Sequence, residues 1–257
     1  MDETVVDAVT QLPLSGPEAD GGEVVRVLSY NIRSLRDDRT AVVRVIRACD
    51  PDLVCIQESP RFWFPRPQAA WLARATGLMV LSGGPSASGP LLLGRLRALP
   101  LSVHDVLLPK RAGLHQRGFA TTVVRLGRGA PFSLTSCHLS LDADERFEHF
   151  KALLAHVSTT DVPHHVIGGD FNEHPDKPGW QLLASRMQDG WVAAPWGGEY
   201  TSVPDNPYQR IDGVFASPGI EVLACGVPHG LPRDRDLRSA SDHLPVLAVL
   251  RVPPGAL

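Results

Sequence analysis

The sequence predicts a single-domain α/β fold, and three observations support this prediction. Two stretches, residues 24–57 and 132–169, each show a strand pattern, then a helix pattern, then a second strand pattern. The chain has 257 residues and is 43% hydrophobic, so it can bury the core of one large domain. Its 23 glycines and 23 prolines indicate many turns between short elements.

The first strand–helix–strand unit begins with the apolar run Val24–Tyr30, which predicts a strand. Arg39–Cys49 places its apolar side chains at the spacing of one helix face, and the sequence Asp50-Pro51-Asp52 ends that helix. Leu53–Gln57 then predicts a short buried strand.

The second unit has the same order of elements. Phe132–His138 predicts a strand, Asp142–Val157 a helix that Asp142 can cap, and His164–Gly169 a further strand. The other predicted strands are residues 78–81, 91–96, 101–108, 119–126, 210–216, 220–226 and 244–251, and the other predicted helices are residues 68–76 and 179–187.

Residues 1–22 are acidic, rich in glycine and proline, and without periodicity, which predicts a flexible N-terminal segment before a folded domain of residues 23–257. This segment lacks the basic head and apolar run of a signal peptide, and no apolar run is long enough to span a membrane. Four cysteines lie in apolar stretches without metal-binding spacing, which favours buried thiols. We therefore expect a cytoplasmic, monomeric protein without disulfides.

Polar residues collect where the predicted strands end, and packing of a buried sheet gives no reason for them. They are Asn31, Glu58, His138, Asp170, Asn172, Asp212, Asp242 and His243. Carboxylate and amide oxygens suit Mg²⁺ or Mn²⁺, whereas no zinc-type spacing, GxSxG elbow or phosphate-binding glycine loop is present. The set fits metal-assisted attack of water on phosphorus.

Six motifs appear in order: LSYNIR, PDLVCIQES, SCHLSLD, IGGDFNEHP, QRIDGVFAS and SDHLPV. This series resembles the motifs of the endonuclease/exonuclease/phosphatase superfamily, which has the fold of pancreatic deoxyribonuclease, and it extends from residue 28 to residue 246. The resemblance implies a four-layer α/β sandwich of two mainly antiparallel mixed β-sheets flanked by helices. It also implies a metal-dependent phosphoesterase.

Residue by residue, the resemblance implies that Glu58 is the main ligand of the metal, with Asn31 and Asp242 contributing. Asp170 would orient or deprotonate the attacking water, and Asn172 would hold that water or a phosphate oxygen. Either Asp170 or His243 would be the base. The resemblance further implies that Asp212 pairs with His243, which would meet the phosphate as a cation, and that His138 is a second phosphate donor. Some family members have a metal-binding acid where this chain has Arg33, which leaves one or two metal ions open.

For the substrate we expect a phosphate ester: nucleic acid, a phospholipid headgroup or a small metabolite. A phosphodiesterase is the first expectation, with a phosphatase as the alternative and a non-catalytic binding module as the rival from another class. Arg117 precedes a strand beside the site and is a candidate phosphate contact, with a plain surface arginine as the other interpretation. The aromatic residues that follow Glu58 are expected in the core, although they could instead form an apolar wall for the leaving group.

Overall fold

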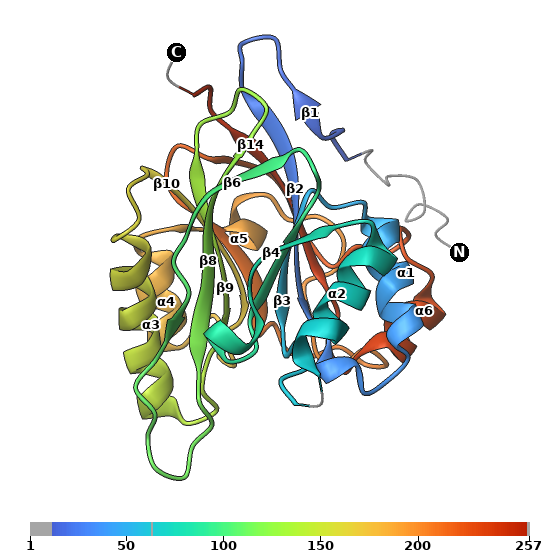
Figure 1. Ribbon diagram of the computed structural model, residues 1–257, viewed down its shortest axis with the longest axis vertical. Helices are drawn as coiled ribbons and strands as arrows, with labels where there is room; N and C mark the ends of the chain where they lie inside the picture. The colour runs from blue at the N-terminus through green and yellow to red at the C-terminus, as the bar shows by residue number, and fades with distance from the viewer. Residues whose placement is uncertain (1–11, 63, 256–257) are drawn as a thin grey trace, which may run out of the picture.

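The computed structural model describes residues 12–62 and 64–255 of the chain and contains two facing β-sheets (Figure 1). The first sheet has seven strands. In spatial order six of them are β13 (Glu221–Gly226), β14 (Val246–Val252), β2 (Glu23–Asn31), β3 (Leu53–Gln57), β5 (Leu91–Gly94) and β4 (Met79–Gly83), and β1 (Gly16–Pro17) pairs with β2.

The second sheet also has seven strands. In spatial order six of them are β11 (Gln188–Asp189), β12 (Asp212–Ala216), β10 (His164–Asp170), β9 (Phe132–His138), β8 (Gly118–Leu126) and β6 (Ala98–Val103), and β7 (Val106–Leu107) pairs with β8. Each sheet has one parallel pair, β2 with β3 and β9 with β10, and every other pairing among the described strands is antiparallel. The expected mainly antiparallel mixed sandwich is confirmed.

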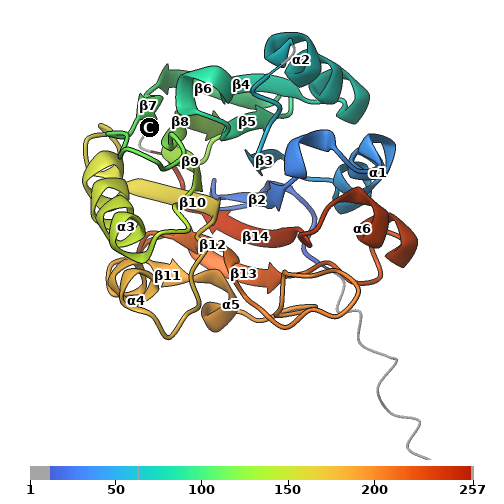
Figure 2. The same ribbon diagram turned by 90° about the horizontal axis from the view of Figure 1, so that it is seen from below.

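Helices cover the two outer faces, as the view from below shows (Figure 2). Three of them lie beside the first sheet: α1 (Arg39–Cys49), α2 (Pro65–Thr76) and α6 (Asp234–Ala240). Two lie beside the second: α3 (Ala143–Val157) and α4 (Pro178–Ala184). The short helix α5 (Gly190–Ala193) and the 3₁₀ turns η1 (Arg33–Leu35) and η2 (Gly84–Ala87) complete the described helical elements. None of the helices in the described ranges is long and apolar enough to cross a membrane.

Helices α1 and α3 explain the two parallel pairs. Each helix connects the two strands of its pair, and a parallel connection needs such a crossover. Asp38 caps α1 by accepting hydrogen bonds from two backbone N–H groups, and Asp142 caps α3 by accepting one from Glu145. The two strand–helix–strand units predicted from the sequence therefore each build the centre of one sheet.

The core consists of three main apolar layers, one between the sheets and one beneath each set of helices. The sheets approach closely at Gly168 of β10, where an added Cβ would lie 2.9 Å from the Cβ of Cys55 on β3. All four cysteines are buried and unpaired, as the sequence predicts. The sandwich thus holds β2 and β3 against β9 and β10, the strands that end in the polar residues.

Three features differ from the sequence expectation. Regular structure begins before residue 23, since β1 pairs with β2 and both Glu18 and Asp20 pair with Arg251. Residues 1–11 of the predicted N-terminal segment lie outside the described residues. The predicted strand 101–108 is two strands, β6 and β7, which pair with β8 in one register on either side of a break at His104–Asp105, where the Asp105 side chain accepts the backbone N–H of Thr121, and α6 was not predicted. Helix α6 has too few apolar residues to show a helical period in the sequence.

Candidate active site

The polar strand ends meet at one edge of the sandwich. Strand β2 ends at Asn31, β9 ends at His138 and β10 ends at Asp170, while Glu58 directly follows β3. Because both parallel pairs run the same way within their own sheets, their carboxyl ends are adjacent in each sheet. The register places Asp170 opposite His138 on one side and opposite Asp212 on the other.

Asp170 lies at the centre of this cluster and is only 1% exposed. Its Oδ2 accepts a hydrogen bond from Nδ2 of Asn31 at 2.9 Å, across the two sheets. The same oxygen lies 3.4 Å from Nε2 of His138 and 3.8 Å from Nε2 of His243. The backbone N–H of Asn172 donates to Oδ1 at 3.0 Å, and Asn172 has a positive φ of 51° that the surrounding structure must hold. The carboxylate is therefore fixed from both sheets.

His243 and Asp212 form a close pair. The Nδ1 atom of His243 lies 2.9 Å from Oδ2 of Asp212. Burial alone would lower the pKa of His243, but attraction to Asp212 and then Asp170 outweighs burial and raises its pKa to about 10. The raised pKa favours the imidazolium form of His243 at neutral pH.

His138 behaves in the opposite way although it touches the same carboxylate. Burial lowers its pKa to about 3, with attraction to Asp170 opposing the shift and repulsion from Arg117 and His243 adding to it. His138 is thus neutral at neutral pH. A neutral imidazole can still donate one hydrogen bond, so the expected donor role at this position requires no charge.

The expected metal ligands lie together on the first sheet. Asn31 Nδ2 is 3.5 Å from Oε1 of Glu58, and Oδ1 of Asn31 accepts the backbone N–H of Arg33 at 3.0 Å. Asp242 is more exposed and lies 3.2 Å from Nε of Arg33, which also pairs with Asp37. The partly exposed carboxylates of Glu58 and Asp242 and the buried amide of Asn31 match the donor preference of Mg²⁺ or Mn²⁺.

A second group with ligand geometry lies deeper. One ligand atom from each of Asp170, Asp212 and His243 lies within 4.8 Å of the others. However, the 2.9 Å contact between His243 and Asp212 already uses one ring nitrogen. A cation and the imidazolium would compete for the same carboxylates, so the Glu58 group fits a cation better.

Arg117 is buried rather than a plain surface residue. Only 9% of it is exposed, and its guanidinium makes no hydrogen bond or ion pair with a described residue. Burial lowers its pKa, and attraction to Asp170 opposes that shift. The expectation that the aromatic residues after Glu58 pack in the core is wrong for Phe62 and Phe64. These side chains are 74% and 76% exposed because the loop from β3 to α2 projects them outward; residue 63 lies outside the described residues.

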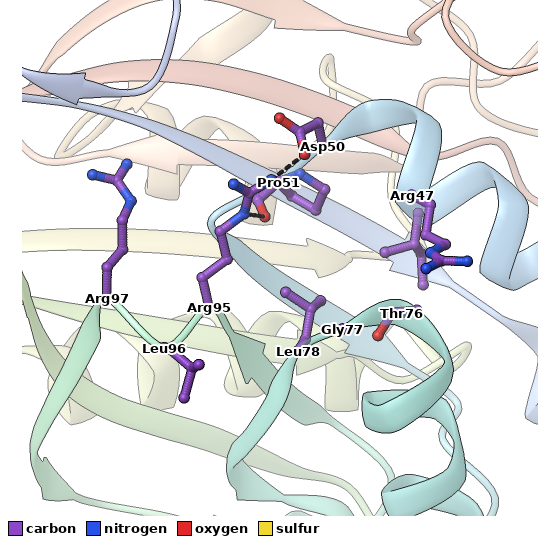
Figure 3. A pocket seen from close by; sticks show the side chains of 10 residues that line it. Arg47, Asp50, Pro51, Thr76, Gly77, Leu78, Arg95, Leu96 and Arg97 are labelled. Carbon is purple, nitrogen blue, oxygen red and sulfur yellow. Dashed lines mark hydrogen bonds and ion pairs between the residues drawn. The ribbon is translucent and has the colours of Figure 1, made fainter.

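Two pockets differ in their relation to the cluster. One, of about 700 Å³, opens beside Asn172 and is lined by Arg111, Phe147 and His174 among others. The other, of about 440 Å³, lies at the opposite end of the first sheet, where β3 begins (Figure 3). Its Arg95 donates to Asp50 and Arg97 pairs with the buried Asp52, so these cations are already neutralised. Of these two pockets, the one beside Asn172 adjoins the polar cluster.

Several supporting residues were not predicted as site residues. Gln57 Nε2 lies within hydrogen-bonding distance of Ser29, Ser136 and Gly168, which ties the sheets together beneath Glu58. Ser241 Oγ donates to the backbone oxygen of Asn31 at 2.7 Å. Both residues lie inside quoted motifs, so position within a motif was the available signal. His149 on α3 is also buried.

Comparison with known proteins agrees with this geometry. The model of the endonuclease/exonuclease/phosphatase family matches residues 28–243. No curated protein matches the sequence. Among solved structures, an endonuclease/exonuclease/phosphatase from Bacteroides vulgatus is 19% identical with a TM-score of 0.72, covering 89% of this chain and 99% of its own.

Two further structures have more specific names. A mannosyl-6-phosphatase from Bacteroides thetaiotaomicron is 18% identical with a TM-score of 0.71, covering 88% of this chain and 99% of its own. A humanized D. rerio TDP2 is 18% identical with a TM-score of 0.66, covering 88% of this chain and 98% of its own. At these identities the likeness shows a shared fold.

Proposed function

Because the chain belongs to the endonuclease/exonuclease/phosphatase family, whose members hydrolyse phosphate esters, we propose that it is a metal-dependent phosphoesterase. The observation that supports this most is that three side chains converge on Asp170. They are Asn31 at the end of β2, His138 at the end of β9, and His243 in the segment between α6 and β14. A buried carboxylate held by three nitrogen groups is costly to build for packing alone, and it is suited to catalysis.

Asp170 orients the attacking water and accepts its proton. His243 carries a proton already, since its pKa is raised to about 10, so it is a poor base at neutral pH. Of the two bases left open by the sequence, the electrostatics support Asp170. Its hydrogen bonds from Asn31 and from the Asn172 backbone fix the direction of its free lone pairs.

The remaining groups stabilise negative charge that develops on the phosphate. His243 presents an imidazolium, which Asp212 holds through Nδ1. His138 contributes a neutral N–H donor, and the side-chain amide of Asn172 is held by the backbone oxygen of Leu139 at 3.1 Å. Donors fixed before the reaction need no reorganisation when the charge appears.

A divalent cation, Mg²⁺ or Mn²⁺, would be held by Glu58 and Asn31, with Asp242 beside them. The chemistry that such an ion supplies is neutralisation of phosphate charge and polarisation of the phosphorus–oxygen bond. Glu58 has a positive φ of 51°, and Gln57 is anchored to both sheets beneath it, so the chain itself directs this carboxylate toward the cluster.

The finer choice of ester lies between a phosphodiester, which the sequence favours, and a phosphomonoester. A nucleic-acid diesterase would need a cationic track, whereas the chain has a net charge of −3. The pocket beside Asn172 combines Phe147 with charged groups of both signs, which suits a small polar leaving group such as a metabolite or a headgroup. A phosphatase of this kind is therefore the second candidate.

The direct test is hydrolysis of p-nitrophenyl phosphate and bis(p-nitrophenyl) phosphate with Mg²⁺, Mn²⁺ or EDTA. We expect metal-dependent turnover of at least one ester. Asp170→Asn should lower kcat by about a hundredfold or more, because it removes the base without removing the side chain. Asp176→Asn, an exposed carboxylate in the following loop, is the matched control and should keep parental activity.

Equal rates for Asp170→Asn and the parent enzyme would contradict the assigned mechanism. No turnover of either ester, together with Mg²⁺ binding by calorimetry, would instead support the rival binding module. Glu58→Gln separates these cases further, since it should weaken Mg²⁺ binding whether or not the protein is an enzyme.

A further inference from the structure

Arg117 is a buried cation without a direct partner. It is 9% exposed, its Nε makes no hydrogen bond with a described residue, and no described carboxylate lies within ion-pair distance of it. Its charge is offset at a distance by Asp170, Glu58 and Glu145. An unpaired buried charge is unfavourable, so a group that binds an anionic ligand is a better explanation than packing.

Arg61 lies beside it and is anchored through a single nitrogen. Its Nη1 donates to the backbone oxygen of Ser88 at 3.2 Å, to the Ser88 hydroxyl at 3.1 Å and to the backbone oxygen of Gln116 at 3.5 Å. Gln116 directly precedes Arg117 in the chain. The other nitrogens of Arg61 make no hydrogen bond with a described residue, so they remain available to a ligand.

The path of the main chain holds Arg61 in this position. Gly89 has a φ of +122°, and a Cβ added to it would lie 3.4 Å from Cδ of Arg61, so the arginine stem lies directly against this glycine. Ser88 also has a positive φ, of 57°. A guanidinium fixed in this way loses little freedom when it binds.

We propose that Arg61 and Arg117 form an anion subsite beside Asp170 that selects a terminal phosphate monoester over a phosphodiester. This inference rests on the proposed function, because the subsite adjoins the catalytic cluster, and of the two esters considered there it favours the phosphomonoester of the second candidate. Strand β8 begins at Gly118, directly after Arg117, and pairs with β9 so that Phe119 lies opposite Cys137, which brings Arg117 beside the His138 end of β9. Nε2 of His138 lies 3.4 Å from Asp170, and Arg61 contacts the backbone oxygen of Gln116, so both arginines adjoin the catalytic cluster. Arg61 is thereby a specificity-determining residue that motif matching did not indicate.

The selectivity follows from charge. A monoester carries close to two negative charges at neutral pH, and a diester carries one. Each guanidinium therefore attracts the monoester about twice as strongly at equal distance. A monoester also has three unsubstituted oxygens where a diester has two, so it can make a bidentate contact with one guanidinium and still offer an oxygen to the other.

The test compares Arg61→Gln with Arg66→Gln, an exposed arginine in the neighbouring helix α2. With Mg²⁺ present, Arg61→Gln should lower kcat/KM for p-nitrophenyl phosphate about ten- to hundredfold, mainly through KM, and that for bis(p-nitrophenyl) phosphate less than about threefold. Arg66→Gln should change neither value. Equal losses for the two esters would mean that Arg61 only braces the loops, and would overturn the proposal.

A binding measurement separates this inference from the proposed reaction. By calorimetry at constant ionic strength, the parent protein should bind inorganic phosphate at least about tenfold more tightly than dimethyl phosphate, and Arg61→Gln should lose this preference. Arg117→Lys keeps the positive charge but removes the planar guanidinium that can donate two parallel hydrogen bonds. It should therefore also weaken phosphate binding. Equal affinities in the parent overturn the subsite. A phosphate preference without turnover of any ester would retain the subsite and refute the enzymatic function.

Discussion

At the scale of single residues, the site separates two histidines that touch one carboxylate. His243 has an acidic partner on its other ring nitrogen and is charged, whereas His138 has none and is neutral. The difference arises from Asp212, because both rings are buried and both face Asp170. One buried aspartate thereby decides which histidine meets the substrate as a cation.

This account predicts the titration of His243. Asp212→Asn removes the strongest attraction on His243, so the pKa of His243 should fall below its parental value of about 10. The pKa of the isotope-labelled imidazole is measured by NMR in the metal-free protein. Asp242→Asn, a weaker contributor, should lower it less. An unchanged pKa in Asp212→Asn would contradict the assignment.

The sign of the linked stability change follows from the raised pKa. The Asp212–His243 pair stabilises the fold fully below the ordinary histidine value of about 6.5 and loses this contribution as pH rises through about 10. We therefore compare the free energy of unfolding in urea of the metal-free parent and of metal-free Asp212→Asn. The difference between the two free energies should be largest at pH 6 and should shrink by pH 10. A difference that grows with pH would contradict this sign.

At the scale of elements, helix α3 links the second sheet to the site. Its N-cap, Asp142, follows the loop that leaves His138, and its buried face presents Glu145 toward the surroundings of Arg117. The start of α3 therefore fixes where that loop and the buried charges lie. A cap at this point acts on the geometry of the site as well as on helix stability.

Removal of this cap gives a second stability prediction. Asp142→Ala should cost about 1 kcal/mol, because the hydrogen bond to the backbone N–H of Glu145 is lost. For a chain of this size the melting temperature should fall by about 2–4 °C. Asp144→Ala, in the first turn of the same helix, is the control and should lower the free energy of unfolding by only about a few tenths of a kcal/mol. Equal losses would mean that Asp142 acts by charge alone.

At the scale of the whole molecule, the site depends on how closely the two sheets approach. Asn31 on the first sheet can reach Asp170 on the second only because small residues lie between the strands leading to them. Gly168 faces Ser29 and Cys55 across this gap, with no room for a Cβ. The spacing of the layers is thus part of the catalytic geometry.

Gly168→Ala tests this spacing. The added methyl group should destabilise the fold by about 1–3 kcal/mol in urea unfolding, because it overlaps the Cβ of Cys55. Cys55→Gly alone leaves a cavity, and combined with Gly168→Ala it should be less destabilising than the sum of the two changes. Additive losses in this double-mutant cycle would show that the sheets do not meet as described.

The sequence by itself determined most of the elements and the gathering of polar residues at strand ends. Strand and helix periods, together with the breaks at glycine and proline, are local, so they can be recognised without knowledge of packing. The motif order added the family and the sandwich. Helix α6 was not predicted because it has no clear apolar period, and the strand after residue 100 is interrupted at His104–Asp105, which its composition does not reveal.

Only the tertiary structure decided which atoms meet. The contact of Asn31 with Asp170 joins residues 139 positions apart, and its length depends on the packing of two sheets. Packing likewise determined the different charge states of His138 and His243, the missing partner of Arg117 and the outward position of Phe62. Each of these depends on distances and solvent access between segments remote in sequence, which a local pattern cannot contain. Together they make a set of polar residue types into a site with specified chemistry.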